Sequence, residues 1–202
     1  RRCSLRLRLR SQSAPGVHPT PPPRQLLIVG PKPSCETEAV SARPNIYAPE
    51  ITQQRRAVAG FHADRAALGP AAGMERLGMS LWILPPGQAA YPYHFHLAEE
   101  EALVVLEGTP ALRTPDGLRT LERGEVVAFP RGEAGAHQVI NESDAEVRFL
   151  AISTAGEPEI AFYPDECKVG VWSREPGVPG HLFRLSDAVD YNDGVEPRST
   201  TT

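Results

Sequence analysis

The segment Gly87–Gly108, GQAAYPYHFHLAEEEALVVLEG, contains two histidines separated by one residue, followed by three consecutive glutamates. Residues two apart in a β-strand point to the same face, so His94 and His96 are expected to share one cavity. After a short polar turn, Glu101 precedes an apolar run that is typical of a buried strand and stops at Gly108. Two neutral imidazoles and a carboxylate that converge on one point indicate a divalent-metal site that lacks a fourth ligand.

A candidate for that ligand lies in a second segment, GEVVAFPRGEAGAHQVIN, residues 124–141. A short apolar strand ends at Pro130, a turn with two glycines follows, and His137 begins another apolar stretch. If that stretch pairs beside the first strand, His137 completes a set of three histidines and one glutamate. Such a set suits Mn, Fe, Ni, Co or Zn as the divalent ion and leaves coordination positions open for water or substrate.

Short apolar segments separated by turns fill the middle of the chain. Strands are expected over residues 79–84, 90–96, 102–107, 111–114, 118–121, 125–129, 138–140 and 146–153. Many short strands at even spacing, with Gly and Pro turns and no long segment of helical period, predict an all-β sandwich or barrel. Asn141 is expected to hold the turn at the end of its strand, and a short helix is expected to begin at Ser186.

The two segments together resemble the paired motifs of the cupin superfamily, as found in small single-domain bacterial members. The first motif is carried by Gly87, His94, His96, Glu101 and Gly108, and the second by Gly124, Pro130, Gly132, His137 and Asn141. Two loops within these motifs are slightly longer than is usual in the family, where insertion is readily tolerated. The resemblance implies a double-stranded β-helix, or jelly-roll, barrel over residues 44–174, with the metal ligands His94, His96, Glu101 and His137.

The family's spacing favours Glu101 as the acidic ligand, because the distance from Glu101 to Gly108 matches the first motif. Glu99 and Glu100 are then expected to lie in a solvated turn. Tyr91 and Tyr93 have opposite parity to the two histidines, so on an ideal strand they point away from the metal. Arg113, Gln138 and Arg148 could reach a bound anion, although no spacing selects them, and His62 and His181 match neither motif.

The ligand set favours a metal-dependent enzyme that acts on a small polar molecule such as a sugar, sugar acid or oxo-acid. Isomerase or lyase chemistry fits these ligands, and so does an Fe(II)-dependent dioxygenase. A non-catalytic cupin that binds or senses a small ligand is a further alternative. The sequence identifies no catalytic acid or base.

Composition excludes several classes of protein. The chain has 202 residues, of which 41% are hydrophobic and 23% charged, with a formal net charge of -4. The first 35 residues contain no Asp or Glu, so the remainder is acidic and unsuited to nucleic acid. No apolar run reaches the ~20 residues of a membrane helix, and the three widely spaced cysteines suggest neither a zinc knuckle nor a disulfide framework. We therefore expect a cytoplasmic protein with a small-molecule ligand and, from the interface-type aromatic residues, a homodimer.

The two ends of the chain differ from its middle. Residues 1–43 are rich in Pro and Arg and are expected to be disordered; a non-native extension and an organelle-targeting segment are both open interpretations. Residues 175–202 are expected to form a C-terminal extension. The run Tyr163-Pro-Asp, followed by Lys168-Val-Gly, resembles the tail of bacterial single-domain cupins, which carry glycine where this chain has Cys167. Cys167 would be strained if its φ is positive.

Overall fold

The structure of the chain, a computed structural model, describes residues 43–56, 58–173, 175 and 177–196. Its strands are β1 (Gln53–Arg55), β2 (Ala63–Ala67), β3 (Gly78–Leu84), β4 (Phe95–His96), β5 (Glu101–Glu107), β6 (Ala111–Thr114), β7 (Gly117–Thr120), β8 (Val126–Phe129), β9 (Gln138–Ile140), β10 (Val147–Ser153), β11 (Glu159–Tyr163), β12 (Lys168–Trp172) and β13 (His181–Arg184). The helical elements are α1 (Leu68–Ala71) and the 3-10 turns η1 (Glu133–Gly135) and η2 (Leu185–Asp187). Within the described ranges no helix has the length and apolar character needed to cross a membrane.

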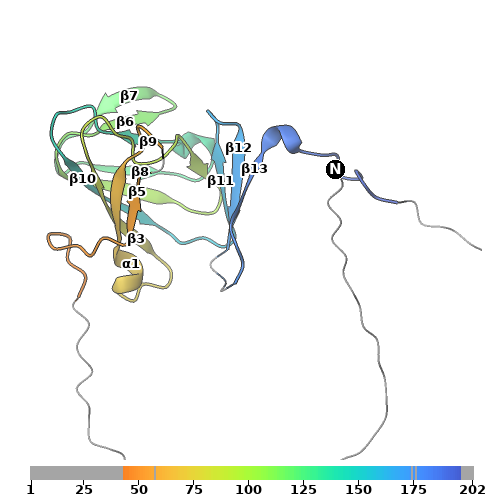
Figure 1. The fold of residues 1–202 in the computed structure, drawn as a ribbon, viewed down its shortest axis with the longest axis horizontal. Coiled ribbons are helices and arrows are strands. Elements are labelled where there is room, and N and C mark those ends of the chain that lie inside the picture. The colour runs from red at the N-terminus through yellow and green to blue at the C-terminus, as the bar shows by residue number, and fades with distance from the viewer. Residues whose placement is uncertain (1–42, 57, 174, 176, 197–202) are drawn as a thin grey trace, which may run out of the picture. The chain divides into compact units, whose positions relative to one another are not determined.

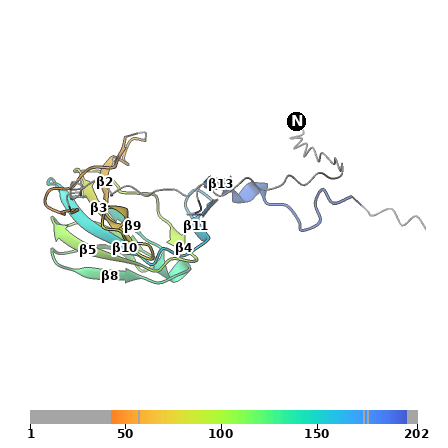
Figure 2. The same ribbon diagram turned by 90° about the horizontal axis from the view of Figure 1, so that it is seen from below.

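The strands form three antiparallel sheets (Figures 1 and 2). One sheet has the order β1-β2-β3-β10-β5-β8, a second β13-β12-β11-β4, and a third β7-β6-β9. Isolated backbone bridges between Ala89 and Ile140, and between His94 and His137, connect the chain before β4 to the region of β9. The architecture confirms the all-β jelly-roll prediction. The segment expected to be disordered lies almost entirely outside the described residues.

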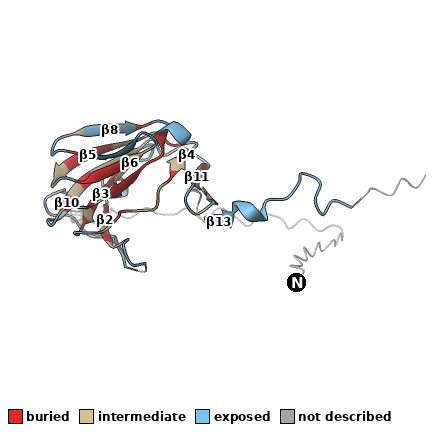
Figure 3. Cartoon of the chain, turned by 90° about the horizontal axis from the view of Figure 1, so that it is seen from above, coloured by how far each residue is buried: buried red, intermediate tan, exposed pale blue. Residues whose placement is uncertain are grey.

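Most predicted strands agree with the observed ones to within a residue, and two predictions are wrong in extent. The strand expected over residues 90–96 is reduced to β4, because Pro92 has no N–H to donate to a ladder and the chain before it makes only isolated bridges. The helix expected from Ser186 is the single 3-10 turn η2. It follows β13, whose four residues are all exposed (Figure 3).

The main hydrophobic core lies on one face of the six-stranded sheet. Alternation places every second residue of β3, β5 and β10 on this face, and its fully buried members include Leu84, Leu103, Val105, Val147 and Phe149. Phe149 stacks on Trp82 with ring centroids 6.3 Å apart. The opposite face of the sheet packs Leu81 against residues of the N-terminal segment and α1, including Ile46 and Leu68. The central strands β3, β5 and β10 thus contact apolar residues on both faces of the sheet, which fixes their register.

Two residues of the sequence motifs, Gly108 and Asn141, stabilise turns and do not belong to the histidine cluster. Gly108 ends β5 at φ +76°, and a Cβ there would lie 2.8 Å from Val147 Cγ2 and 2.9 Å from the Glu146 carbonyl oxygen. Asn141 is fully buried, donates from Nδ2 to the carbonyl oxygens of Leu84 and Ala145, and accepts at Oδ1 from Ser143. The prediction that Asn141 is a turn residue is confirmed.

Cys167 adopts φ +49°, the left-handed conformation anticipated from its position. Because L residues other than Gly, Asn and Asp rarely adopt this conformation, the backbone is strained there.

Candidate metal centre

The backbone brings the histidines of the two motifs side by side. His94 precedes β4 and forms a bridge with His137, in which each amide N–H donates to the other's carbonyl oxygen at 3.2 and 2.9 Å. His96 ends β4, which pairs with β11. The ring centroid of His94 lies 4.8 Å from that of His96 and 4.9 Å from that of His137. Two segments about forty residues apart in sequence therefore supply three adjacent imidazoles.

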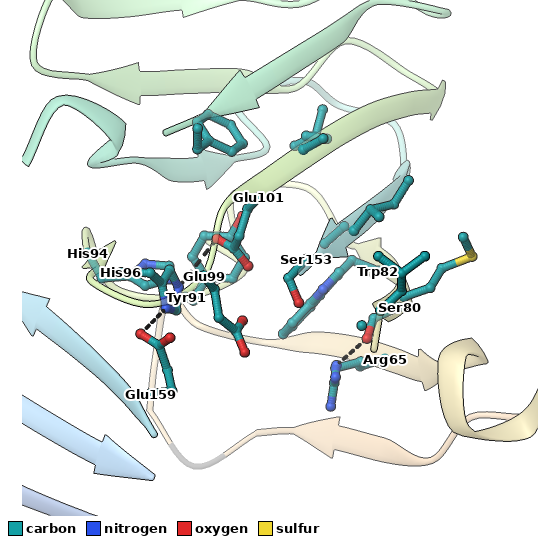
Figure 4. Close-up of a pocket in the computed structure, with 18 of the residues that line it drawn as sticks. Arg65, Ser80, Trp82, Tyr91, His94, His96, Glu99, Glu101, Ser153 and Glu159 are labelled. Carbon is teal, nitrogen blue, oxygen red and sulfur yellow. Dashed lines mark hydrogen bonds and ion pairs between the residues drawn. The ribbon is translucent and has the colours of Figure 1, made fainter. Parts of the chain in front are cut away.

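Each imidazole has its Nδ1 against an oxygen atom. Nδ1 lies 2.9 Å from the Pro92 carbonyl oxygen in His94 and 2.9 Å from the Gly135 carbonyl oxygen in His137. In His96 it lies 3.0 Å from Glu159 Oε1, the contact drawn in Figure 4. Since a carbonyl oxygen only accepts, the neutral rings of His94 and His137 carry their proton on Nδ1. Their Nε2 lone pairs are then available for a ligand.

Glu101 is the first residue of β5, and its carboxylate lies close to the Nε2 atoms of His96 and His137. Its Oε2 lies 3.3 Å from Nε2 of His96 and 3.4 Å from Nε2 of His137. Ligand atoms of His94, His96 and Glu101 all lie within 4.8 Å of one another. The structure therefore brings together all four residues named from the sequence, and alternation along β5 puts Glu101 on the same face as the buried residues Leu103 and Val105.

Burial shapes the protonation of this cluster. Desolvation lowers the pKa of His94 well below its usual range and that of His137 to about 4, so both rings are neutral near pH 7. Desolvation also lowers the pKa of His96, but the hydrogen bond that its Nδ1 donates to Glu159 and the charges of Glu101 and Glu159 raise it overall. Desolvation raises the pKa of Glu101 to about 7.

The cluster has the properties of a site for a divalent ion. Nε2 of His96 is buried and has no hydrogen-bond partner among the described residues, a state that costs free energy unless another ligand binds it. Three imidazole nitrogens and one carboxylate are the donor types that transition-metal ions prefer. His96, Glu99 and Glu159 form a second group whose ligand atoms lie within 4.8 Å of one another.

The cluster forms part of the wall of a cavity of about 500 Å³ (Figure 4). Polar side chains that sequence reasoning had not assigned to the site also line it, namely Arg55, Arg65, Ser80, Ser153, Glu159 and Tyr163. Glu159 lies 63 residues from its partner His96, and no motif marks it. Neither His62 nor His181 is among the lining residues.

Two expectations about the site are wrong. Tyr91 does not point away from the histidines; it lines the cavity and meets the rings of His94 and His137 edge-on, at centroid distances of 4.9 and 5.6 Å. Parity fails because residues 90–94 do not form a continuous strand. Glu99 is buried at 7% exposure and lines the cavity, whereas Glu100 is exposed as expected.

The residues considered for anion binding are occupied elsewhere. Arg113 forms a two-pronged ion pair with Asp165, at 2.6 and 3.0 Å, and covers the ring of Tyr93. Gln138 donates to the Tyr91 carbonyl oxygen, and Arg148 donates to the Ile46 carbonyl oxygen. None of Arg113, Gln138 and Arg148 lines the cavity.

Comparison with known proteins relates this geometry to a family. Residues 80–153 match the family described as Cupin domain. A putative sugar phosphate isomerase from Acidithiobacillus ferrooxidans is 27% identical over 65% of this chain and 81% of that chain, with a TM-score of 0.59. A sugar phosphate isomerase of a cupin superfamily from Silicibacter pomeroyi is 24% identical over 74% of this chain and 97% of that chain, with a TM-score of 0.63. The second likeness concerns the fold alone. No curated protein matches the chain.

Proposed function

Residues 80–153 form a cupin domain, and from that premise we propose that the chain is a metal-dependent enzyme acting on a small sugar-type molecule. The observation that carries the proposal is the arrangement of the three imidazoles. Each has Nδ1 against an oxygen atom, and the Nε2 atoms of His96 and His137 both lie close to Glu101. Arrangements of this kind orient histidines for metal binding.

The proposed ligands are His94, His96, Glu101 and His137. The ion would be Mn, Fe, Ni, Co or Zn in its divalent state, since all of these accept imidazole and carboxylate donors. Such an ion would polarise a carbonyl oxygen of the substrate and so make the neighbouring C–H bond more acidic. In an octahedral ion, four protein ligands would leave one or two positions free for substrate oxygens, as in a catalytic site and unlike a closed structural one.

We propose redox-neutral isomerisation as the reaction. An aldose–ketose isomerisation moves a proton between adjacent carbons, which requires a base inside the cavity. We assign the proton transfer to Glu99, because its side chain is buried at 7% exposure and lines the same cavity two residues before Glu101. The similarity to the putative sugar phosphate isomerase supports this reaction class.

Metal content tests the ligand assignment. Purified protein is analysed for Mn, Fe, Co, Ni and Zn, alongside the variants His96→Ala and His137→Ala. The matched control is His181→Ala, which removes an exposed histidine of β13. We expect about one ion per chain in the wild type and the control, and less than a tenth of that in the two site variants. Equal metal content in all four proteins would refute the assignment.

Activity tests the reaction class. Metal-loaded protein is incubated in D₂O with aldoses, ketoses, sugar acids and their phosphates, and NMR follows both conversion and deuterium incorporation. We expect a substrate that gains deuterium at the carbon next to its carbonyl, with the signal lost in Glu99→Gln although metal content stays normal. Oxygen uptake by iron-loaded protein with diketones, catechols or thiols would instead indicate a dioxygenase. Ligand binding without turnover would indicate a sensing module.

We further propose that the chain forms a homodimer in the cytoplasm. Exposed apolar side chains in and around β13, among them Leu182, Phe183 and Leu185, support an interface. Light scattering coupled to size-exclusion chromatography should give twice the chain's 21.9 kDa. A mass equal to one chain at micromolar concentration would contradict the dimer.

A further inference from the structure

Two arginines lie in the cavity beyond the histidine cluster. β1 pairs with β2 so that Gln53 lies opposite Arg65 and Arg55 opposite Ala63, and β2 pairs with β3 so that Arg65 lies opposite Trp82. Opposite residues share a face, so Arg55, Arg65 and Trp82 are all on the side that lines the cavity. The guanidinium carbons of Arg55 and Arg65 lie 4.9 and 5.7 Å from the centre of the Trp82 ring.

Within the part of the chain that the structure describes, neither guanidinium has an anionic partner. Arg65 donates from Nε to Ser80 Oγ at 3.0 Å, the contact drawn in Figure 4. Among the described residues, no side-chain hydrogen bond is made by Arg55, and neither arginine forms an ion pair. Arg56, next to Arg55, pairs with Asp64, and Arg113 pairs with Asp165. The two cavity arginines therefore differ from neighbouring arginines, which have carboxylate partners.

The electrostatic setting of the pair is unfavourable without a ligand. Desolvation lowers the pKa of both arginines, and the charge of Arg55 lowers that of Arg65 further, because two like charges lie close together. A guanidinium offers five donors in a planar fork that matches phosphate and carboxylate oxygens. An oxyanion between the two side chains would satisfy these donors and remove the repulsion.

We propose that Arg55 and Arg65 bind the acidic group, a phosphate or a carboxylate, of the substrate that reaches the histidine cluster. That the anion belongs to the substrate rests on the proposed function. The ring of Trp82 lies 5.5 Å from that of Tyr91, which in turn lies 4.9 Å from the ring of His94. The arginine pair and the histidine cluster thus lie at two ends of one row of aromatic rings that line the same cavity.

Anion binding by the full-length chain tests this inference. Inorganic phosphate and acetate are titrated calorimetrically into protein loaded with its ion and into protein treated with a chelator. Arg55→Gln and Arg65→Gln are compared with Arg123→Gln, which removes an exposed arginine outside the cavity. We expect the wild type and Arg123→Gln to bind one of the two anions equally well, and each cavity variant to bind it about tenfold more weakly or worse.

The preferred probe identifies the acidic group. Stronger binding of phosphate indicates a phosphorylated substrate, and stronger binding of acetate indicates a carboxylic acid. The inference is overturned if the wild type binds neither anion, or if Arg55→Gln and Arg65→Gln bind as well as the control. Arg55→Lys keeps the positive charge but loses the planar array of guanidinium donors. Its affinity for the preferred anion should lie between those of the wild type and Arg55→Gln.

Anion binding by the arginines and metal binding by the histidine cluster can fail independently of each other. Chelator-treated protein that binds phosphate through the arginines while the purified chain contains no metal would contradict the metal proposal alone. Metal-loaded protein that binds neither anion would contradict this inference alone. Urea unfolding of each variant verifies that it is folded before its affinity is interpreted.

Discussion

Replacing Glu159 with Gln tests whether a residue outside the proposed ligand set orients a ligand. Glu159 begins β11 and is 7% exposed, and its Oε1 accepts the hydrogen bond from Nδ1 of His96 at 3.0 Å. Its other oxygen, Oε2, is buried without a hydrogen-bond partner among the described residues. Glu159→Gln preserves an acceptor for Nδ1 and nearly the same shape but removes the negative charge that makes the imidazole a stronger donor to a metal.

The expected effect is on metal affinity. Partners of this kind typically contribute about 10- to 100-fold, which corresponds to about 1.4–2.8 kcal/mol. We expect the lower part of this range, because the glutamine oxygen still orients the ring. Glu159→Ala, which removes the acceptor as well, should fall in the upper part.

Competition against a chromophoric chelator measures the dissociation constant of each variant for the ion found in the purified protein. Glu142→Gln, which removes an exposed carboxylate, is the control and should bind like the wild type. An affinity for Glu159→Gln within twofold of the control would refute the orienting role. Complete loss of binding would refute it as well, because Glu159 would then be a direct ligand, as its proximity to Glu99 and His96 also permits.

Three further predictions concern protonation, packing and strain. The pKa of Glu101 is raised to about 7, and a carboxylate ligand must lose its proton to bind a metal ion. Metal affinity should therefore fall at least about tenfold for each pH unit below about 7. An affinity that is constant between about pH 5.5 and 7.5 would contradict this prediction. Phe149→Ala should lower the free energy of unfolding in urea by about 3–5 kcal/mol, since Phe149 is fully buried, whereas Leu118→Ala at an exposed site should change it by less than about 0.5 kcal/mol. Cys167→Gly should raise the free energy of unfolding by about 0.5–1 kcal/mol, because glycine adopts a φ of +49° without strain. A decrease would show that the Cys167 side chain stabilises the fold by more than its backbone strain destabilises it.

The histidine–glutamate cluster was predictable because its signals are local. The spacing of His94 and His96, the apolar run that follows Glu101, and the turn before His137 each act over a few residues, and all four side chains meet as expected. The strand assignments succeeded for the same reason, since strands such as β5 and β10 are short apolar segments that end at turns.

The rest of the cavity depends on long-range pairing that the sequence does not encode locally. Arg55 and Arg65 reach the cavity only because β1 and β2 extend the six-stranded sheet beside β3. Glu159 reaches His96 only because β11 pairs with β4. The errors at Tyr91 and Glu99 have a different origin: both lie in irregular chain next to β4, where the period of an ideal strand no longer determines side-chain direction.

The proposed ligands come from separate sheets, and this has a mechanical consequence. His96 belongs to the sheet of β11, Glu101 to that of β10, and His137 immediately precedes β9 in the third. An ion held by all of them would act as a further cross-link among sheets that are otherwise joined by loops, side-chain packing and isolated backbone bridges such as that between His94 and His137. Removal of the ion should therefore weaken the contacts between the sheets first. Proteases should then cleave the loops that join the sheets well before the strands unfold.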